Sequence, residues 1–315
     1  MSQPKVTVVL AVKNEARFLK QTVADLLGQT YSNIHIIAID DGSTDETASL
    51  LNLYSTKIQI IRNDVSRGQS HCINRAMELS DSPYLAVADG DDEYVQDKIS
   101  RQISFLEKHA EIGVCGCQIH TIPTGLHWNL PTTHNKILGR MPFNMPMAHP
   151  AIIYRRTALL NSRYDETLRQ AKDYDFLYRL RHKTRFYNLP FKGVRYRLNK
   201  ADSQAQQLRI QTANQIRAAI LNEDFGINHP EFIQLHNTIC NLQQGADSSL
   251  FSDWVNTILS RNSQYHQKSL QQELHTQIWH YINKFKLNRR EGLKHLLLSG
   301  LPLSQKAKSG IKLLQ

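Results

Sequence analysis

The stretch YLAVADGDDEY, residues 84–94, indicates both how this chain folds and where its chemistry lies. Its first part, YLAVA, is a short apolar run typical of a strand buried on both faces. Its second part places four acidic residues in the five positions 89–93, around one glycine. These charges repel one another unless something positive neutralises them. The cluster is compatible with a solvated turn, the start of a helix or a metal site.

Three further apolar runs of the same kind precede this stretch, at residues 5–12, 34–39 and 58–63. The segments between the runs carry apolar residues at helical spacing. Because strand and helix alternate, the sequence predicts an α/β fold with a Rossmann-like, mostly parallel, doubly wound sheet.

Polar residues follow these strands at the points where the strands end. They are VKN at 12–14, DD at 40–41 and DGDD at 89–92. Ligands of open α/β sheets bind beyond the carboxyl ends of the strands, so we expect these three elements to meet at one rim. We also expect Asn14 and Ser43 to cap the helices that follow them.

The alternation changes after residue 111. We expect strands at 112–120 and 151–155, a helix at 171–183, and two edge strands at 184–190 and 193–198. Beyond about residue 205 the pattern is polar and helical, which predicts a boundary near residues 203–208. The result is a first domain of residues 1–205 and a helical C-terminal region of residues 206–315.

Charge is unevenly distributed along the 315 residues. From residue 251 onward there are ten Lys and Arg against three Asp and Glu, a net +7, whereas the whole chain carries +10, which leaves +3 for residues 1–250. An acidic partner is therefore expected to meet the tail. The tail is either a helical cap with a solvated basic face or an interfacial segment at an anionic membrane. No nucleic-acid-binding module is recognisable, so nucleic acid is not an expected partner.

The cysteines and the apolar segments bear on the compartment. The four cysteines show no zinc-binding spacing, and no segment reads as a signal peptide or a membrane span. We expect a cytoplasmic protein, either free or peripheral on the inner face of the membrane.

Each acidic motif has two interpretations when taken alone. DDGSTD at 40–45 has the composition of a turn and helix cap, or it provides a carboxylate for a nucleotide. The three aspartates of ADGDDEY exceed what a helix start needs, and an Asp-x-Asp pair offers hard oxygen ligands for Mg²⁺ or Mn²⁺. We favour the metal interpretation.

Taken together, four segments carry a resemblance: VVLAVKNEARFL, IHIIAIDDGSTDET, SRGQSHCINRAME and YLAVADGDDEY. In this order and spacing they resemble the inverting glycosyltransferases of family 2, which have the nucleotide-sugar-binding GT-A fold. One departure is at positions 11 and 13, where Pro and Tyr are commoner in the family. The resemblance divides the first domain into a nucleotide-binding half, residues 1–115, and an acceptor half, residues 116–205.

The resemblance also implies roles for residues that hold the donor. Ala11, Val12 and Glu15 are expected against the nucleoside, with Asp41 at the edge of a uracil-like base. Arg67 is expected near the base or the phosphates, and Asp89 and Gly90 near the ribose. Asp91, with Asp92, is expected to hold Mn²⁺ or Mg²⁺ on the diphosphate, where the ion stabilises the charge of the leaving group.

On the acceptor side, the resemblance implies that Asp173 is the base that deprotonates the attacking hydroxyl. The alternative is that Asp173 is only an acidic residue that stabilises the first turn of a helix. The residue before it is Lys172, where the family usually has glutamate. His149 is expected near the donor sugar or the acceptor. Asn199 replaces the family's histidine and is a weaker candidate metal ligand.

The predicted function is metal-dependent, inverting transfer of a sugar from a nucleotide sugar, UDP-linked by expectation, to a saccharide or a lipid-linked saccharide. Bacterial surface polysaccharide or lipopolysaccharide is the expected product. A nucleotidyltransferase is the enzyme rival, but VKNEARF is not the Gly-rich, basic loop that such enzymes use. The other rival is a catalytically degenerate relative that binds nucleotide sugar or acts as a membrane scaffold.

Overall fold

The computed structural model of the protein describes residues 3–198 and 203–285. The chain divides into two units, one of residues 1–137 and 146–209 and the other of residues 138–145 and 210–315. The sheet and all of the predicted site residues that the structure describes belong to the first unit. The predicted division of function between domains stays a prediction.

The first half of the sheet is parallel, with strand order β3-β2-β1-β4. The strands are β1 (Val6–Val12), β2 (Ile34–Asp40), β3 (Gln59–Arg62) and β4 (Tyr84–Asp89). The helices of this half are α1 (Ala16–Leu27), α2 (Thr47–Asn52), α3 (Gln69–Leu79) and α4 (Lys98–Lys108). The α/β alternation predicted from the apolar runs is confirmed here.

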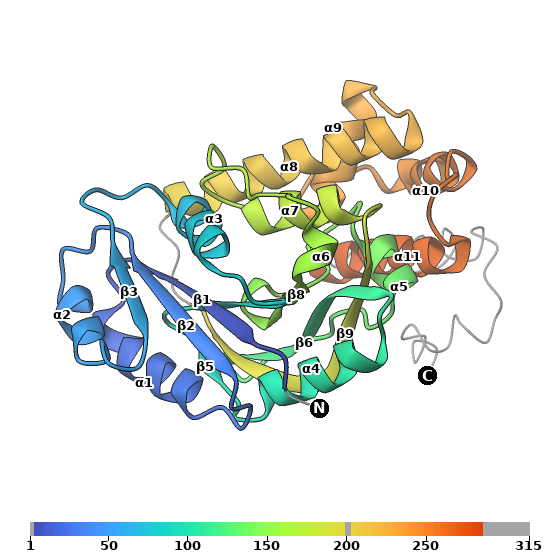
Figure 1. Ribbon diagram of the computed structural model, residues 1–315. Helices are drawn as coiled ribbons and strands as arrows, with labels where there is room; N and C mark the ends of the chain where they lie inside the picture. Colours follow the sequence, from blue (N-terminus) through green and yellow to red (C-terminus); the bar gives the residue numbers. More distant parts are fainter. Residues whose placement is uncertain (1–2, 199–202, 286–315) are drawn as a thin grey trace. The chain divides into compact units, whose positions relative to one another are not determined.

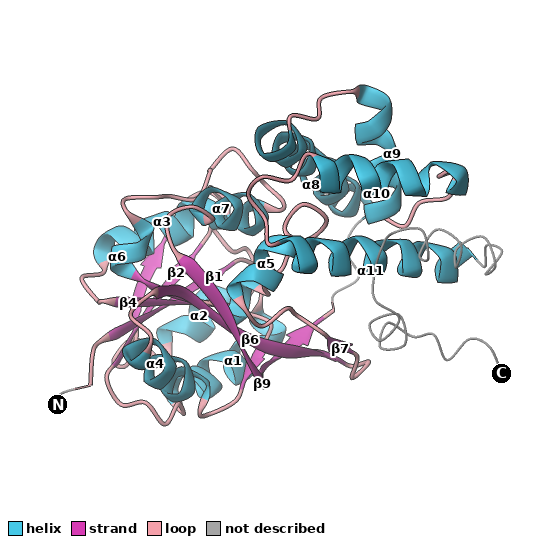
Figure 2. Ribbon diagram, turned by 90° about the vertical axis from the view of Figure 1, so that its right-hand side faces the viewer, coloured by secondary structure: helices cyan, strands magenta, loops and turns pink. Residues whose placement is uncertain are grey.

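The second half of the sheet is mixed, and it continues the order as β8-β6-β9-β5. Its strands are β5 (Glu93–Tyr94), β6 (Ile112–Ile122), β7 (His127–Trp128), β8 (Ile153–Arg155) and β9 (Arg185–Arg197) (Figures 1 and 2). β8 runs antiparallel to β4 and β6, and β6 runs parallel to β9. Shorter elements connect them: α5 (His134–Arg140), the 3₁₀ turn η1 (His149–Ala151), α6 (Arg156–Leu159) and α7 (Lys172–Leu180).

The expectation of two edge strands at 184–190 and 193–198 is wrong. β9 is one strand, and it lies between β6 and β5. Pro190 has no N–H to donate to a ladder, and the register passes from the pair Cys117–Leu189 to the pair Gln118–Lys192 across an irregularity. A bulge of this kind accommodates proline inside a strand.

The expected helix caps are also wrong. Asn14 has a left-handed backbone (φ 56°) and its side-chain oxygen accepts a hydrogen bond from Thr44 N at 2.9 Å. Ser43 Oγ accepts from Asn14 N at 3.0 Å. The two residues therefore connect the loops after β1 and β2 by hydrogen bonds to backbone N–H groups of these loops.

The core of the first unit lies on both faces of the sheet. On one face, alternate residues of β1 such as Val8 and Leu10 pack in one cluster with Leu19 and Val23 of α1 and Ile103 of α4. On the other face lies α3, which contacts β1 and β2. Figure 1 shows α1, α2 and α4 on one side of the strands and α3 on the other. The helices thus leave the carboxyl ends of the strands uncovered by the hydrophobic layers.

The second unit is helical in its described part. Its elements are α8 (Ser203–Phe225, whose first residues belong to the first unit), α9 (Pro230–Cys240), the 3₁₀ turn η2 (Ser248–Leu250), α10 (Phe251–Ser260) and α11 (Gln267–Phe285). Trp254, His236 and Phe143 form a buried aromatic group. Arg217 is buried beside it, and its guanidinium donates to Asn237 at 2.8 Å and to Asn241 at 2.7 Å. The polar helical pattern predicted after residue 205 is therefore confirmed as helices with a core of their own.

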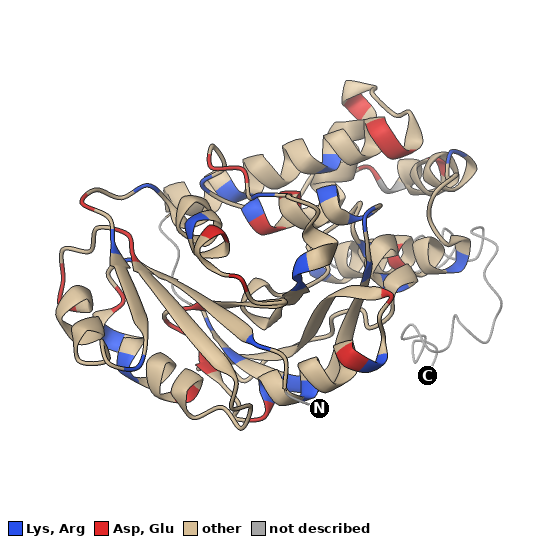
Figure 3. Cartoon of the chain, in the orientation of Figure 1, with Lys and Arg blue, Asp and Glu red and all other residues tan. Residues whose placement is uncertain are grey.

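Among the helices that the structure describes, none is long and apolar enough to cross a membrane. Lys and Arg are interspersed with Asp and Glu along the described elements (Figure 3). Most of the basic tail, residues 286–315, lies outside the described residues, so its predicted membrane contact stays a prediction.

Candidate active site

The carboxyl ends of β1, β2 and β4 lie side by side. In the parallel register, Val12 pairs with Asp40 and Ala11 pairs with Asp89. Polar residues from three separate segments are therefore neighbours at the edge where open α/β sheets bind ligands. We call the following group the rim: Ala11, Val12, Glu15, Asp41, Asp89, Gly90 and Asp91.

Asp41, directly after β2, is buried and fully hydrogen-bonded. Its Oδ1 accepts from Asn63 Nδ2 and from Arg67 N, each at 2.8 Å. Its Oδ2 accepts from Ser66 Oγ at 2.7 Å and from Gly68 N at 2.8 Å. Burial acts to raise the pKa of Asp41, but these hydrogen bonds outweigh it and lower the pKa to about 2.

These four hydrogen bonds use the acceptor positions that a carboxylate normally offers. Asp41 is therefore the residue that holds the loop 63–68 against the end of β2. The predicted contact between Asp41 and a base stays a prediction, and it requires one of these bonds to be exchanged.

Gly90 is the point where the turn after β4 approaches β1 and α1 most closely. A Cβ at this position would lie 2.6 Å from Val12 Cγ1 and 3.2 Å from Glu15 Cγ. Thr22 Oγ1 on α1 donates to the carbonyl oxygens of Gly90, at 2.9 Å, and Asp92, at 2.7 Å. Glycine is needed here because any side chain would push the turn away from Val12 and Glu15.

The pKa of Glu15 is raised by its burial and by the neighbouring carboxylates. Burial, followed by the charges of Asp91, Asp89 and Asp45, raises the pKa of Glu15 from its ordinary value of 4.5 to about 8. The carboxylates of the rim are thus close enough to act on one another. Their combined field favours a bound cation.

The three aspartates after β4 have different surroundings. Asp89 and Asp91 are half-buried, and Asp89 Oδ1 accepts from Gln69 Nε2 at 2.7 Å. Asp92 is only 1% exposed, and its Oδ1 accepts from Arg197 N at 2.7 Å. Burial and then the charge of Asp89 raise the pKa of Asp92. The geometry therefore gives Asp92 an inward-facing carboxyl, whereas Asp89 and Asp91 are accessible at the rim.

The donor set can be tested against a divalent ion. Within residues 3–198 and 203–285, no group of three or more His, Cys, Asp or Glu side chains is arranged to hold a metal. Mg²⁺ and Mn²⁺ are commonly bound by one or two carboxylates together with phosphate oxygens and water. The oxygens of Asp89 and Asp91 suit that incomplete set. Asn199, the further predicted ligand, lies outside the described residues.

Two residues at this site were not predicted. Arg197, on β9, donates from Nε to the Asp91 carbonyl oxygen at 2.8 Å, and its Nη2 lies 3.2 Å from Glu93 Oε1. Gln69, at the start of α3, orients Asp89. Gln69 sits in the SRGQ segment that was already part of the resemblance, whereas only the fold brings Arg197 to the acidic turn.

Asp173 lies in the first turn of α7 and is half-buried. Its Oδ1 accepts from Tyr174 N at 3.0 Å. Its neighbour Asp175 is held by Arg179, with Nη2 2.7 Å from Oδ2. The two acids of this turn therefore have different partners. Asp175 is part of an ion pair on the helix, whereas Asp173 accepts a hydrogen bond from the backbone.

His149 of η1, Tyr164 and Tyr154 of β8 form a buried chain of polar groups. His149 Nε2 lies 3.0 Å from Tyr164 Oη, which lies 2.8 Å from Tyr154 Oη. Burial lowers the pKa of His149, while the charges of Asp89 and of Asp173 act to raise it. Both carboxylates are thus within electrostatic range of one buried imidazole. We call His149, Tyr154, Tyr164 and Asp173 the α7 cluster.

Lys172 and Arg67 lie at the edges of these groups. Lys172 is half-buried at the start of α7, and its charge acts to lower the pKa of His149. Arg67 is exposed, and with His71 and Arg75 it lines a cavity of about 360 Å³ next to the loop that Asp41 holds. The structure therefore places Arg67 beside the rim, with its side chain on the α3 side.

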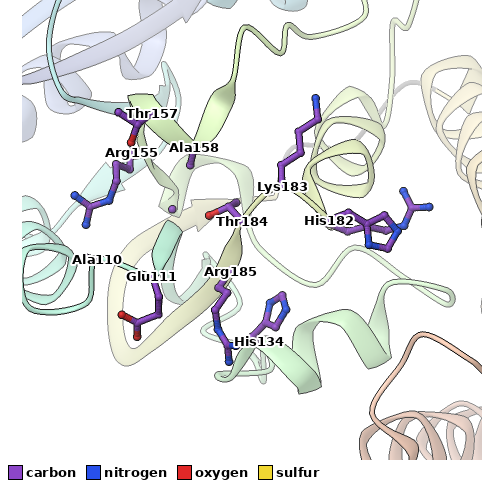
Figure 4. A pocket seen from close by; sticks show the side chains of 12 residues that line it. Ala110, Glu111, His134, Arg155, Thr157, Ala158, His182, Lys183, Thr184 and Arg185 are labelled. Atoms are coloured by element: carbon purple, nitrogen blue, oxygen red, sulfur yellow. The ribbon is translucent and has the colours of Figure 1, made fainter.

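A larger cavity, of about 490 Å³, is lined by none of the predicted site residues (Figure 4). Its basic side chains include Arg155, Arg181, Lys183 and Arg185. Arg155 Nη1 already donates to Tyr84 Oη at 2.7 Å, and Lys183 Nζ donates to Ser162 Oγ at 2.9 Å. Arg155 and Lys183 are thus engaged by other parts of the fold, and the rim is the better candidate site.

An open α/β sheet with an acidic carboxyl rim, and a second carboxylate on a helix of its mixed half, is compatible with a glycosyltransferase of the GT-A type. The family model for glycosyl transferase family 2 matches residues 7–171, more than half of the chain. The protein belongs to glycosyl transferase family 2 and is a glycosyltransferase.

Individual relatives agree with this assignment. An uncharacterized glycosyltransferase of Haemophilus influenzae is 28% identical over 233 residues, 68% of this chain and 72% of that protein. The Escherichia coli UDP-Glc:α-D-GlcNAc-diphosphoundecaprenol β-1,3-glucosyltransferase WfaP is 38% identical over 103 residues, which is 32% of this chain and 41% of WfaP.

Solved structures show the same fold. Staphylococcus aureus TarS residues 1–349 in complex with UDP-GlcNAc superposes with a TM-score of 0.57 at 15% identity, covering 96% of this chain and 92% of that one. The mannosyltransferase PcManGT of Pyrobaculum calidifontis, in complex with GDP-Man and Mn²⁺, gives 0.54 at 14% identity, covering 98% and 80%. The predicted family, fold class and enzyme class are confirmed.

Proposed function

We propose that this glycosyltransferase moves a sugar from a UDP-linked donor to the hydroxyl of a saccharide, with inversion at the anomeric carbon. The observation that carries the proposal is the position of His149, which lies within electrostatic range of Asp89 at the rim and of Asp173 on α7. This proximity supports a leaving-group site and a base within one site, as transfer requires.

The donor is assigned to the rim. Ala11 and Val12 provide buried backbone at the end of β1, and the loop ordered by Asp41 provides Arg67 for the base or the phosphates. UDP is favoured over other nucleotides because WfaP is named for a UDP-Glc donor and TarS was solved with UDP-GlcNAc. Asp89 is assigned to the ribose, with Gln69 orienting its carboxylate.

Mn²⁺ or Mg²⁺ is the proposed cofactor. Asp91 would hold the ion, since its half-buried carboxylate offers hard oxygens in a negative field. When bound, such an ion neutralises charge on the diphosphate leaving group. The buried carboxyl of Asp92 is proposed to support the turn through Arg197 rather than to bind the ion.

Asp173 is proposed as the catalytic base. Its carboxylate takes the proton of the acceptor hydroxyl while that oxygen forms a bond to the anomeric carbon. The bond from the anomeric carbon to the diphosphate oxygen breaks, and its electron pair leaves with UDP. Attack opposite the departing group inverts the centre through an oxocarbenium-like state, as in inverting glycosidases.

The acceptor is proposed to be a saccharide, free or lipid-linked, of a bacterial surface polysaccharide. WfaP is named for a diphosphoundecaprenol-linked acceptor. A basic tail that meets an anionic membrane surface would bring the enzyme to such a substrate. Removal of residues 286–315 is then expected to reduce sedimentation with anionic liposomes, and unchanged sedimentation would contradict the membrane role.

The proposal is tested by measuring UDP release from UDP-glucose, UDP-GlcNAc and UDP-galactose with Mn²⁺ present and after chelation by EDTA. We expect release from at least one donor and its loss with EDTA. Tight UDP binding with no release from any donor would favour the catalytically degenerate relative. Equal release with and without EDTA would contradict metal dependence.

A further inference from the structure

Two aromatic rings meet on the half of the sheet beyond β4. Trp128 on β7 and Tyr196 on β9 have ring centroids 5.3 Å apart, with planes inclined at 45°. β7 and β9 both pair with β6, so that Trp128 is opposite Ile119 and Tyr196 is opposite Thr121 (Figure 2). Positions 119 and 121 face the same side of a strand, and the two rings therefore stand on one face.

The outer ring of this pair is open to solvent. Trp128 is 40% exposed, and Leu126 at the same hairpin is 61% exposed. Tyr196 is half-buried and packs against the core beneath the sheet. An exposed tryptophan supported by a second, anchored ring is an apolar surface that gains free energy when a ligand covers it.

The ring pair borders the proposed catalytic groups. Burial, and then the charges of Asp89, Asp92, Asp173 and Asp91, raise the pKa of Tyr196, so the phenol lies within range of both the rim and α7. The backbone gives the same placement. Tyr94 pairs with Val194, two residues before Tyr196, and the Tyr94 hydroxyl accepts a hydrogen bond from Asp89 N at 2.8 Å.

The order of strands indicates which substrate meets the rings. Asp41 follows β2, Asp89 ends β4, and the rings lie on β7 and β9, further along in the order β3-β2-β1-β4-β8-β6-β9-β5. In the proposed function, a nucleotide bound from Asp41 to Asp89 occupies the parallel half of the sheet, which leaves the mixed half, with the two rings, for the acceptor.

We propose that Trp128 and Tyr196 form a stacking platform for a pyranose ring of the acceptor. This inference rests on the proposed function and specifies the acceptor as a saccharide that is recognised at the ring next to the reacting hydroxyl. The apolar C–H face of the pyranose lies on Trp128, while its hydroxyl edge points towards Asp173.

The test is a set of binding titrations by saturation-transfer NMR with UDP and Mn²⁺ present. The probes are the methyl β-pyranosides of glucose, galactose and N-acetylglucosamine. We expect Trp128→Ala to weaken the best of these glycosides about tenfold. Trp128→Phe, which keeps a ring, is expected to bind it within about threefold of wild type. The control is Leu53→Ala, a truncation of another exposed apolar residue, at 71% exposure, with wild-type affinity expected.

Two results would overturn the platform: a glycoside affinity that Trp128→Ala leaves unchanged, or a wild-type protein that binds none of the three glycosides. UDP affinity separates this inference from the proposed function. All variants should bind UDP like wild type. A wild-type protein that does not bind UDP contradicts the donor assignment instead, whereas UDP binding lost with Trp128→Ala contradicts the assignment of the rings to the acceptor.

Discussion

The rim and the α7 cluster handle their carboxylates in opposite ways. Asp41 at the rim is buried and accepts four hydrogen bonds from one loop, which lowers its pKa to about 2. Asp173 is half-buried in the first turn of α7, and its charge acts on the buried side chains of His149, Tyr154 and Tyr164. The first arrangement fixes a charge and a loop, whereas the second holds the carboxylate that we propose as the base. A transferase needs both, a rigid donor site and a reactive base.

The largest expected effect separates the two acids of α7. Asp173→Asn should lower kcat by about 10² to 10⁴, because the amide cannot take the proton of the acceptor hydroxyl. UDP affinity should not change. The matched control is Asp175→Asn, which removes only an ion pair with Arg179 on the same helix and should leave kcat within about twofold. Steady-state kinetics of UDP release measure both, and equal losses in the two variants would contradict the role of Asp173.

The next effect tests Asp41, the hydrogen-bonded carboxylate of the rim. Asp41→Asn places an NH₂ group opposite donors and should lower the free energy of unfolding by about 2–4 kcal/mol at pH 7. The control is Asp64→Asn in the same loop, where the side chain is exposed and the cost should be within about 0.5 kcal/mol. Urea titrations measure both variants.

The pH dependence of stability sharpens this test. The pKa of Asp41 is lowered from 3.8 to about 2 in the folded protein. Its contribution is therefore present above pH 4 and is lost as the pH falls from about 4 to about 2, a change of about 2 kcal/mol. Asp41→Asn should remove that part of the acid sensitivity. An unchanged acid profile in the variant would show that other carboxyls cause it.

A smaller effect is expected where the turn after β4 meets β1. Gly90→Ala places a Cβ 2.6 Å from Val12 Cγ1 and should cost about 1–3 kcal/mol and weaken UDP binding. Gly125→Ala is an instructive contrast, since its Cβ would meet nothing within 4 Å but its φ is +67°. That variant should lose about 1 kcal/mol of stability and no UDP affinity. Wild-type UDP affinity in Gly90→Ala would show that the turn does not bear on the donor.

The smallest effect concerns the orientation of Asp89. Gln69→Ala removes the hydrogen bond from Nε2 to Asp89 Oδ1, at 2.7 Å, and should raise the KM for the donor about threefold to tenfold with kcat little changed. Gln21→Ala, which removes an exposed bond to Asp25, should leave both constants unchanged. A KM that does not move in Gln69→Ala would mean that Asp89 needs no such support.

The two halves of the sheet also differ in what their sequence could predict. β1, β2 and β4 are apolar runs with polar ends, so local pattern was enough to predict that their ends form one rim. Arg197 and Asp92 are 105 positions apart, and no local pattern indicates that β9 brings them together. The strand at 185–197 was predicted as two strands, because the bulge that accommodates Pro190 depends on the register with β6. The pairing of Trp128 with Tyr196 likewise requires the register of three strands.

The most direct test of the central claim, a metal-dependent donor site at the rim, is a calorimetric titration of UDP with and without Mn²⁺. The wild-type protein should bind UDP tightly only with the ion. Asp91→Asn should lose most of that gain, and Asp97→Asn, an exposed ion-pair residue beyond the turn, should keep it. The same UDP affinity in wild type and Asp91→Asn, or an affinity that Mn²⁺ does not alter, would contradict the account.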